Sequence, residues 1–361
     1  MRQRLGTSSI QLETPVFIIG SASVVGKKEG EGPLGLLFDV VGNDDFFGCD
    51  TWEEAESSLQ KHAVQLALEK AGVHAQDVDC MLAGDLLGQS IATSFGISSY
   101  QIPLLGLYGA CSTCGEALAI GSMMIAGGFA DKTVCVTSSH FASAEKEFRF
   151  PLDYGNQRPL SATWTVTGSG AFVLSANEDG LNNTCYDKAT DMSEAEKTEM
   201  SHVARAKITG ITIGKITDYG VKDSMNMGAC MAPASASTLE RHFIDFNSQP
   251  EDYDKIITGD LGSVGQTILI DLLREKGYDI AGRHMDCGME IFDAGAQDTH
   301  AGGSGCGCSA VTLSAYILKL LEEGTWKKVL FMPTGALLSK TSFNEGKSVP
   351  GIAHAVVLER P

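Results

Sequence analysis

The side chain best suited to covalent chemistry is Cys111, in the stretch GACSTCG at residues 109–115. The residues that follow, from Ser112 to about Gly127, are apolar or small on nearly every face and predict a buried helix. Cys111 then lies at the helix N-terminus, where unpaired N–H groups and the helix dipole favour a thiolate. This placement fits a nucleophile. It fits a small, closely packed cysteine equally well, so position alone leaves both interpretations open.

Two pairs of cysteines raise the question of metal or redox chemistry. Cys111 and Cys114 have CxxC spacing, and Cys306 and Cys308 have an equivalent place later in the chain. Four sulfurs that met would suit zinc. We expect no metal, because Cys114 and Cys308 enter helices where each points into the core, and no histidine is positioned to support them. A thioredoxin-like role lacks a partner segment, and no cofactor is predicted.

A second candidate site is the stretch between residues 140 and 158. Four basic side chains lie there, in a chain with only 27 Lys and Arg: His140, Lys146, Arg149 and Arg158. Aromatic residues are interspersed or follow closely: Phe148, Phe150, Tyr154 and Trp164. Cations beside flat apolar rings suit an aromatic carboxylate. An ordinary surface ion pair is the alternative for each cation. We favour a surface ion pair for Lys146 and a place in a ligand pocket for His140. For Arg149 and Arg158 both alternatives remain open.

The elements that must position these residues occur twice. Four segments have counterparts in the same chain order: 63–86 with 238–261, 111–136 with 306–331, 168–175 with 352–359, and 17–26 with 211–220. Each set alternates strands with helices, which predicts an internally duplicated α/β protein. We expect an N-terminal half over 1–180, an insertion or linker over 181–207, and a C-terminal half over 208–361.

Composition limits the possible functions. The chain has 361 residues and a formal net charge of −18, which argues against nucleic acid as a partner. No apolar run approaches the about 18 residues of a membrane span, and the first residues lack the apolar core of a signal peptide. Ten scattered cysteines suit a reducing compartment, so we expect a cytoplasmic protein.

The duplicated unit, the helix-heading Cys111 and the Gly-rich turn AGGSGCGCSAV at 301–311 resemble the thiolase and ketoacyl synthase superfamily. This resemblance implies a five-layer αβαβα fold, usually dimeric, in which the cysteine takes up an acyl group. Two His, or a His and an Asn, assist it in that superfamily. Here Gly302–Gly305 contains neither, and Asp260 stands where one branch has a His. We therefore predict a non-enzyme in which Cys111 is a vestigial nucleophile.

A more specific resemblance covers residues 16 to 360. The motifs MLAGDLLGQ, GACSTC, TSSHFASAEKEFRFPLDYG, DYGVKDSMNMGACMAPAS, TGDLGSVG and IAHAVVLE resemble the stage V sporulation protein AD family of endospore-forming bacteria. The resemblance implies binding of dipicolinic acid (pyridine-2,6-dicarboxylate), alone or with Ca²⁺, and a role in its uptake into the developing spore. It also implies peripheral association with the spore inner membrane, beside other stage V sporulation membrane proteins.

A pocket for this ligand needs cations or N–H groups on two sides and an apolar slot between them. The predicted ligand-binding residues are Cys111, Ser112, His140, Arg149, Arg158, Ser304 and His354. Asp85 and Asp260 are expected to hold loops rather than calcium. The alternative function is an acyl-CoA-dependent acyltransferase or condensing enzyme that uses Cys111, with His140 or His354 as base. A third possibility is a pure scaffold for a membrane complex.

Overall fold

The computed structural model describes residues 3–149, 158–178 and 204–361. The first half of the chain contributes five neighbouring strands to its large sheet. In spatial order they are β5 (Leu104–Gly106), β4 (Cys80–Gly84), β6 (Lys132–Ser139), β8 (Gly168–Ser175) and β2 (Ser9–Val25). The strands β5, β4 and β6 are parallel, and β8 is antiparallel to both of its neighbours.

The second half repeats this arrangement. Its strands, in the corresponding order, are β11 (His284–Asp286), β10 (Lys255–Thr258), β13 (Lys328–Met332), β16 (Ala355–Glu359) and β9 (Ala206–Thr212). Three are again parallel, and β16 is antiparallel to both neighbours. Antiparallel pairing of β2 with β9 joins the halves. The predicted duplication is confirmed. β9 begins at Ala206, near the predicted start of the second half, and residues 179–203 lie outside the described part of the chain.

Two helices occupy equivalent places at the centre. α4 (Thr113–Ala126) matches the helix predicted after Cys111. Its counterpart α11 (Cys306–Thr312) continues through a π-helical turn at Leu313–Ile317 into α12 (Leu318–Glu322). Every residue of α11 is buried, as its apolar and small composition predicts. α4 contacts β4 and β6 of the first half and β16 of the second, so it lies between the two halves of the large sheet.

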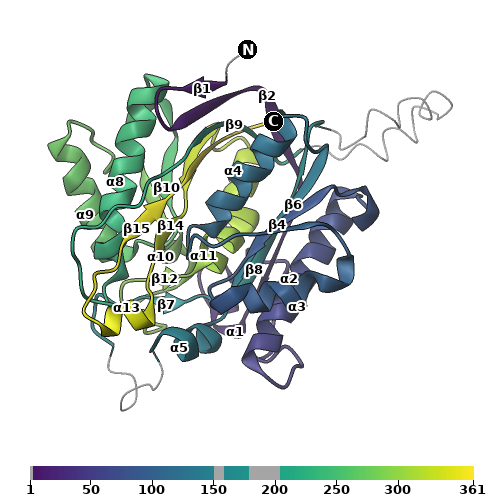
Figure 1. Cartoon of the computed structure of the whole chain (residues 1–361), viewed down its shortest axis with the longest axis horizontal. Helices are drawn as coiled ribbons and strands as arrows, with labels where there is room; N and C mark the ends of the chain where they lie inside the picture. The colour runs from purple at the N-terminus through teal and green to yellow at the C-terminus, as the bar shows by residue number, and fades with distance from the viewer. Residues whose placement is uncertain (1–2, 150–157, 179–203) are drawn as a thin grey trace.

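The outer layers complete the five-layer arrangement. α2 (Trp52–Ala71) lies on β2, β6 and β8, and α3 (Ile91–Ile97) packs against α2. On the opposite side of the molecule, α8 (Met227–Phe246) packs with α9 (Gly262–Glu275). Figure 1 shows these two outer pairs with α4 and α11 between them. The fold is thiolase-like αβαβα, as predicted.

Short elements shape the surface and the site. They are β1 (Arg4–Leu5), α1 (Lys27–Gly30), β3 (Val40–Val41), α5 (Phe141–Arg149), β7 (Trp164–Thr165), α10 (Cys287–Ile291), β12 (Gly303–Ser304), β14 (Thr334–Ala336), α13 (Lys340–Asn344) and β15 (Gly351–Ala353). Pairing of β7 with β12 sets Thr165 directly beside Ser304. This small two-stranded sheet carries residues of both halves to the position of Cys111.

Candidate functional site

Cys111 lies in a small cavity built from both halves of the chain. The lining is Leu86, Tyr108, Ala110, Cys111, Ala144, Phe148, Thr165, Met227, Ser304, Gly305, Ala336 and Leu338. The volume is about 30 Å³, which is room for about one water molecule. Most of the wall is apolar, and the side-chain polar groups are a thiol and hydroxyls. As it stands the cavity is a closed apolar slot.

The Cys111 thiol is protected from solvent and from ionisation. Its exposed fraction is 5%. Burial raises its pKa well above the usual value, and the nearby Asp260 carboxyl raises it further. The preceding residue, Ala110, has φ of 50°, a conformation that L-residues adopt rarely. The thiol therefore occupies the position of a nucleophile but stays protonated.

Asp260 is the polar partner of Cys111. This carboxyl is 1% exposed and lies close enough to the thiol for each group to shift the pKa of the other. Thr334 Oγ1 donates to Asp260 Oδ1 at 2.7 Å, and the Gly305 N–H donates to Oδ2 at 3.0 Å. Burial raises the pKa of Asp260 to about 7, although Thr334, Cys111 and Gly305 lower it. A buried carboxyl group thus lies beside the thiol.

Asp85 has the equivalent place in the first half and holds a loop. Its carboxylate accepts hydrogen bonds from the N–H groups of Leu87 and Thr93, both at 2.8 Å, and from Thr93 Oγ1 at 2.6 Å. The described part of the chain contains no group of three or more His, Cys, Asp or Glu side chains that could hold a metal ion. The thiols of the second cysteine pair are hydrogen-bonded to backbone carbonyl groups. Cys306 Sγ donates to the Ser138 oxygen at 2.8 Å, and Cys308 Sγ donates to the Gly259 oxygen at 3.5 Å.

The basic residues predicted from the sequence have structural partners. His140 is 1% exposed, and its Nε2 lies 2.7 Å from the Asp45 carbonyl oxygen, while its Nδ1 accepts from the Ala142 N–H. Burial lowers the pKa of His140. Lys146 pairs with Glu53 at 2.7 Å, as favoured. Neither basic group lines the cavity.

Arg158 lies against the ring of Trp164, with the guanidinium carbon 4.8 Å from the ring centroid. It donates to the Asp298 backbone carbonyl at 2.5 Å and to the Asp298 carboxylate at 3.2 Å. The Arg149 side chain, Phe150 and Tyr154 lie outside the described residues. Arg149 is the last residue of α5, directly after the cavity residue Phe148.

The remaining predicted residues divide between cavity and scaffold. His354 Nδ1 accepts from the Gly214 N–H at 3.3 Å, and burial lowers its pKa to about 4. Ser112 donates to the Gly109 carbonyl at 2.7 Å. Among the predicted ligand-binding residues whose side chains are described, the structure brings Cys111 and Ser304 together in the cavity and sets the others elsewhere.

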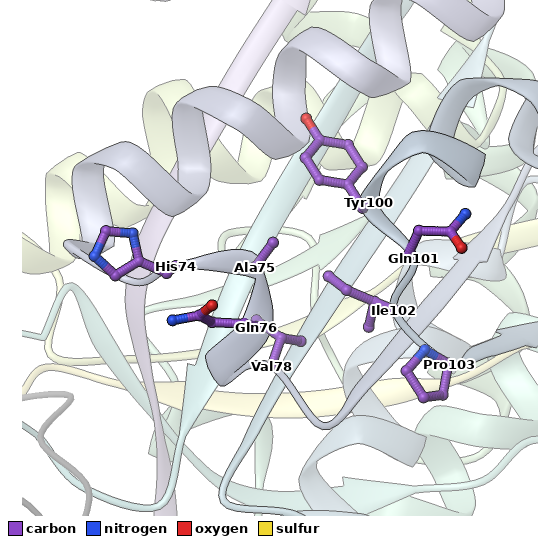
Figure 2. A pocket seen from close by; sticks show the side chains of 8 residues that line it. All are labelled: His74, Ala75, Gln76, Val78, Tyr100, Gln101, Ile102 and Pro103. Atoms are coloured by element: carbon purple, nitrogen blue, oxygen red, sulfur yellow. The ribbon is translucent and has the colours of Figure 1, made fainter.

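A larger hollow lies on the outer surface, with a volume of about 590 Å³. Figure 2 shows the lining side chains in two groups, one of His74, Ala75, Gln76 and Val78 and the other of Tyr100, Gln101, Ile102 and Pro103. None of its lining residues is Lys, Arg, Asp or Glu. This open, uncharged groove offers no charge to fix a carboxylate.

The family model of stage V sporulation protein AD (SpoVAD) matches residues 6–359. Stage V sporulation protein AD of Bacillus subtilis (strain 168) is 41% identical over 355 residues, which are 98% of this chain and 97% of that protein. The chain belongs to the stage V sporulation protein AD family.

The SpoVAD chain shares its fold with enzymes. One similar solved structure is 3-oxoacyl-[acyl-carrier-protein] synthase III from Aquifex aeolicus VF5, with a TM-score of 0.54, 14% identity, and coverage of 95% of this chain and 99% of that one. Another is human mitochondrial 3-ketoacyl-CoA thiolase in complex with CoA, with a TM-score of 0.54, 13% identity, and coverage of 97% and 99%. At such identities the similarity shows the thiolase-like fold alone.

Sequence reasoning missed most of the cavity wall. The prediction that Asp260 holds a loop agrees with the hydrogen bonds that it accepts from the Gly305 N–H and Thr334 Oγ1, but its position beside Cys111 was not predicted. The local sequence around the apolar wall residues Leu86, Met227 and Leu338 contains no motif that marks them as part of a cavity. No helix in the described ranges is long and apolar enough to cross a bilayer.

Proposed function

We propose that this SpoVAD protein binds dipicolinic acid, alone or as its calcium chelate, at the Cys111 cavity and catalyses no reaction on it. The observation that carries the proposal is the buried Asp260 carboxyl, which lies beside Cys111 and raises the pKa of its thiol. The cavity at this position therefore contains a cysteine whose protonated, less reactive form is favoured. Family membership supports a sporulation role.

The cavity has the chemistry for a flat, polar-ended ring. Phe148 and Leu86 supply apolar wall, and the hydroxyls of Ser304 and Thr165 supply donors at one end. A volume of about 30 Å³ is too small for the ligand, so binding requires a wall to move. In our proposal that wall is α5, which carries Ala144 and Phe148 into the cavity, and Arg149 beyond it supplies a cation for one carboxylate.

The competing function is acyl transfer by Cys111, favoured by the position of this cysteine at the head of α4 and by the enzymes that share the fold. Two observations weigh against it. Burial and Asp260 raise the pKa of the thiol, and no histidine lines the described part of the cavity. A thiol whose pKa is raised in this way forms little thiolate at neutral pH.

We further propose that the protein acts on the cytoplasmic side of the spore inner membrane as a peripheral homodimer. Its partners in dipicolinate uptake are then other stage V sporulation membrane proteins. The family assignment supports this cellular setting. Copurification of the protein with membranes from sporulating cells, and its release by high salt without detergent, is the expected result.

Calorimetric titration of the purified protein with dipicolinate, with and without calcium, tests the binding proposal. Benzoate and acetyl-CoA serve as control ligands. We expect saturable binding that is selective for the dicarboxylate and weakened by Ser304→Ala or Arg149→Ala. The matched control Ser339→Ala changes a serine that caps α13 away from the cavity and should bind normally. Acyl labelling of Cys111 by acetyl-CoA without dipicolinate binding would establish the enzyme instead.

A further inference from the structure

A polar pocket with a volume of about 170 Å³ lies apart from the Cys111 cavity. It is bounded by the turn between β1 and β2, the segment after β9, and the second half of α8. Hydroxyl and charged side chains dominate its lining, which is Thr7, Ser8, Ile213, Gly214, Lys215, Ser237, Thr238, Glu240 and Arg241. No residue of the Cys111 cavity takes part in it.

The walls of this pocket are fixed by the protein itself. The Asp245 carboxylate accepts hydrogen bonds from the N–H groups of Ser8 at 3.0 Å and Thr7 at 3.4 Å, which hold the turn against the end of α8. Gly6 has φ of 47°, and a Cβ there would lie 1.9 Å from Asp245 Oδ1, so the close approach requires glycine. On the helix, Thr238 Oγ1 donates to Ala353 O at 3.0 Å. The pocket is therefore formed before any ligand enters.

The cations of the pocket have free donors. Lys215 is exposed and makes no ion pair within the described residues. Arg241 Nη1 lies 3.6 Å from Asp245 Oδ1, beyond hydrogen-bond distance, because that carboxylate is already engaged by backbone N–H groups. The acidic lining residue Glu240 pairs with Lys276 at 2.9 Å.

The charge balance makes this pocket unusual for the molecule. Lys276 pairs with the Glu240 carboxylate, and Asp245 pairs with Arg241, so Lys215 leaves the pocket and these partners net positive, whereas the whole chain has a formal net charge of −18. The field of the rest of the chain opposes anions, so an anion that binds here needs these local donors. Hydroxyl and cationic donors approach from three separate segments, which suits a tetrahedral group with several oxygens better than a planar carboxylate.

We propose that this pocket binds a phosphate group, through Lys215, Arg241 and the hydroxyl of Ser237. The group enters either as inorganic phosphate or as the end of a small phosphomonoester. In this proposal Lys215 supplies a cation from the segment after β9, and Ser237 and Arg241, one turn apart on α8, supply the other donors. The site is independent of the dipicolinate proposal, because the two cavities share no lining residue.

Isothermal titration with inorganic phosphate at low ionic strength tests the site, and glycerol 3-phosphate in a parallel titration distinguishes the free ion from the ester. We expect saturable binding at one site per chain. Lys215→Ala and Arg241→Ala should each raise Kd at least tenfold, about 1.4 kcal/mol. The control Lys222→Ala removes an exposed lysine that does not line the pocket and should leave Kd unchanged.

Further variants keep the result interpretable. Lys215 has an exposed side chain without an ion pair, so Lys215→Ala should keep the melting temperature of the parent. A Cys111→Ala variant should bind phosphate normally, whatever it does to dipicolinate. The proposal is overturned if the parent protein shows no saturable phosphate binding, or if phosphate still binds when Lys215→Ala and Arg241→Ala are combined. Loss of phosphate binding in Cys111→Ala, or binding of acetate as tight as that of phosphate, would also overturn it.

Discussion

The Cys111 thiol, which lines a cavity that both halves of the chain build, lies beside the buried Asp260 carboxyl. Burial and the Asp260 charge raise the pKa of the thiol, whereas burial raises the pKa of Asp260 to about 7 although the thiol lowers it. A 3-oxoacyl-[acyl-carrier-protein] synthase III and a 3-ketoacyl-CoA thiolase share the fold. In our proposal the raised pKa of the thiol favours ligand binding over reaction at this position.

Replacing Asp260 by Asn should make Cys111 more reactive. Burial is the largest cause of the raised pKa of the thiol, and the Asp260 charge is the next. Removing that charge lowers the pKa, and each unit lowered gives on the order of tenfold more thiolate. The measurement is the rate of Cys111 alkylation by iodoacetamide at pH 8, followed by mass spectrometry. Asp271→Asn, an exposed change on α9, is the control; equal rates in all three proteins would contradict the assigned role of Asp260.

Dipicolinate affinity should fall as the pH rises through about 7. A neutral Asp260 donates a hydrogen bond to an incoming carboxylate, whereas an ionised one repels it. The groups that face Asp260 are the Cys111 thiol, Thr334 Oγ1, the Gly305 N–H and the Asp286 carboxyl, so no cation offsets that repulsion among the described residues. Above the pKa we expect about tenfold weaker binding per pH unit.

Titrations in buffers of different ionisation enthalpy measure this coupling directly, since binding above pH 7 should take up one proton. Asp260→Asn should abolish both the proton uptake and the steep pH dependence. If the parent protein binds dipicolinate equally at pH 6 and pH 8, Asp260 does not face the ligand. A protein that binds no dipicolinate at either pH contradicts the proposed function itself.

The sequence predicts the architecture better than the site. The two central helices follow from segments that are apolar all round, and the duplication follows from repeated strand and helix patterns. These are local signals. His140 does follow a strand end beside the cavity, yet its ring turns toward Asp45, 95 residues earlier in the chain. Arg158 is held by Asp298, 140 residues away. Such side-chain directions depend on long-range packing that spacing does not encode.

Glu29 should make the protein less stable as the pH rises. It is 1% exposed, Oε1 accepts from the Thr167 N–H at 2.9 Å, and Oε2 has no hydrogen-bond partner. Burial raises its pKa from 4.5 to about 8. Between pH 4.5 and about pH 8, Glu29 is therefore protonated in the folded state and ionised in the unfolded chain. The resulting stability is complete below pH 4.5 and declines by on the order of 1.4 kcal/mol per pH unit until about pH 8.

Glu29→Gln keeps an acceptor for Thr167 and removes the ionisation. Its free energy of unfolding should match the parent near pH 4.5 and exceed it by several kcal/mol at pH 8, as measured by urea denaturation at both values. Glu31→Gln, at an exposed position two residues on, is the control and should track the parent. A constant difference between Glu29→Gln and the parent across this pH range would mean that Glu29 is charged in the folded state.

Gly170→Ala should destabilise the central layer. A Cβ at Gly170 of β8 would lie 2.6 to 2.8 Å from the backbone and Cβ of Ala310 in α11, so the helix would have to move away from the strand. We expect a loss of about 1–3 kcal/mol in the free energy of unfolding, because the surrounding core is closely packed. The matched control is Gly106→Ala in the edge strand β5, where a Cβ would meet no atom within 4 Å. Chemical denaturation of the two variants should separate them clearly; equal stabilities would show that α11 does not rest on β8 at this point, and the close contact between the central helix and the first-half sheet would have to be abandoned.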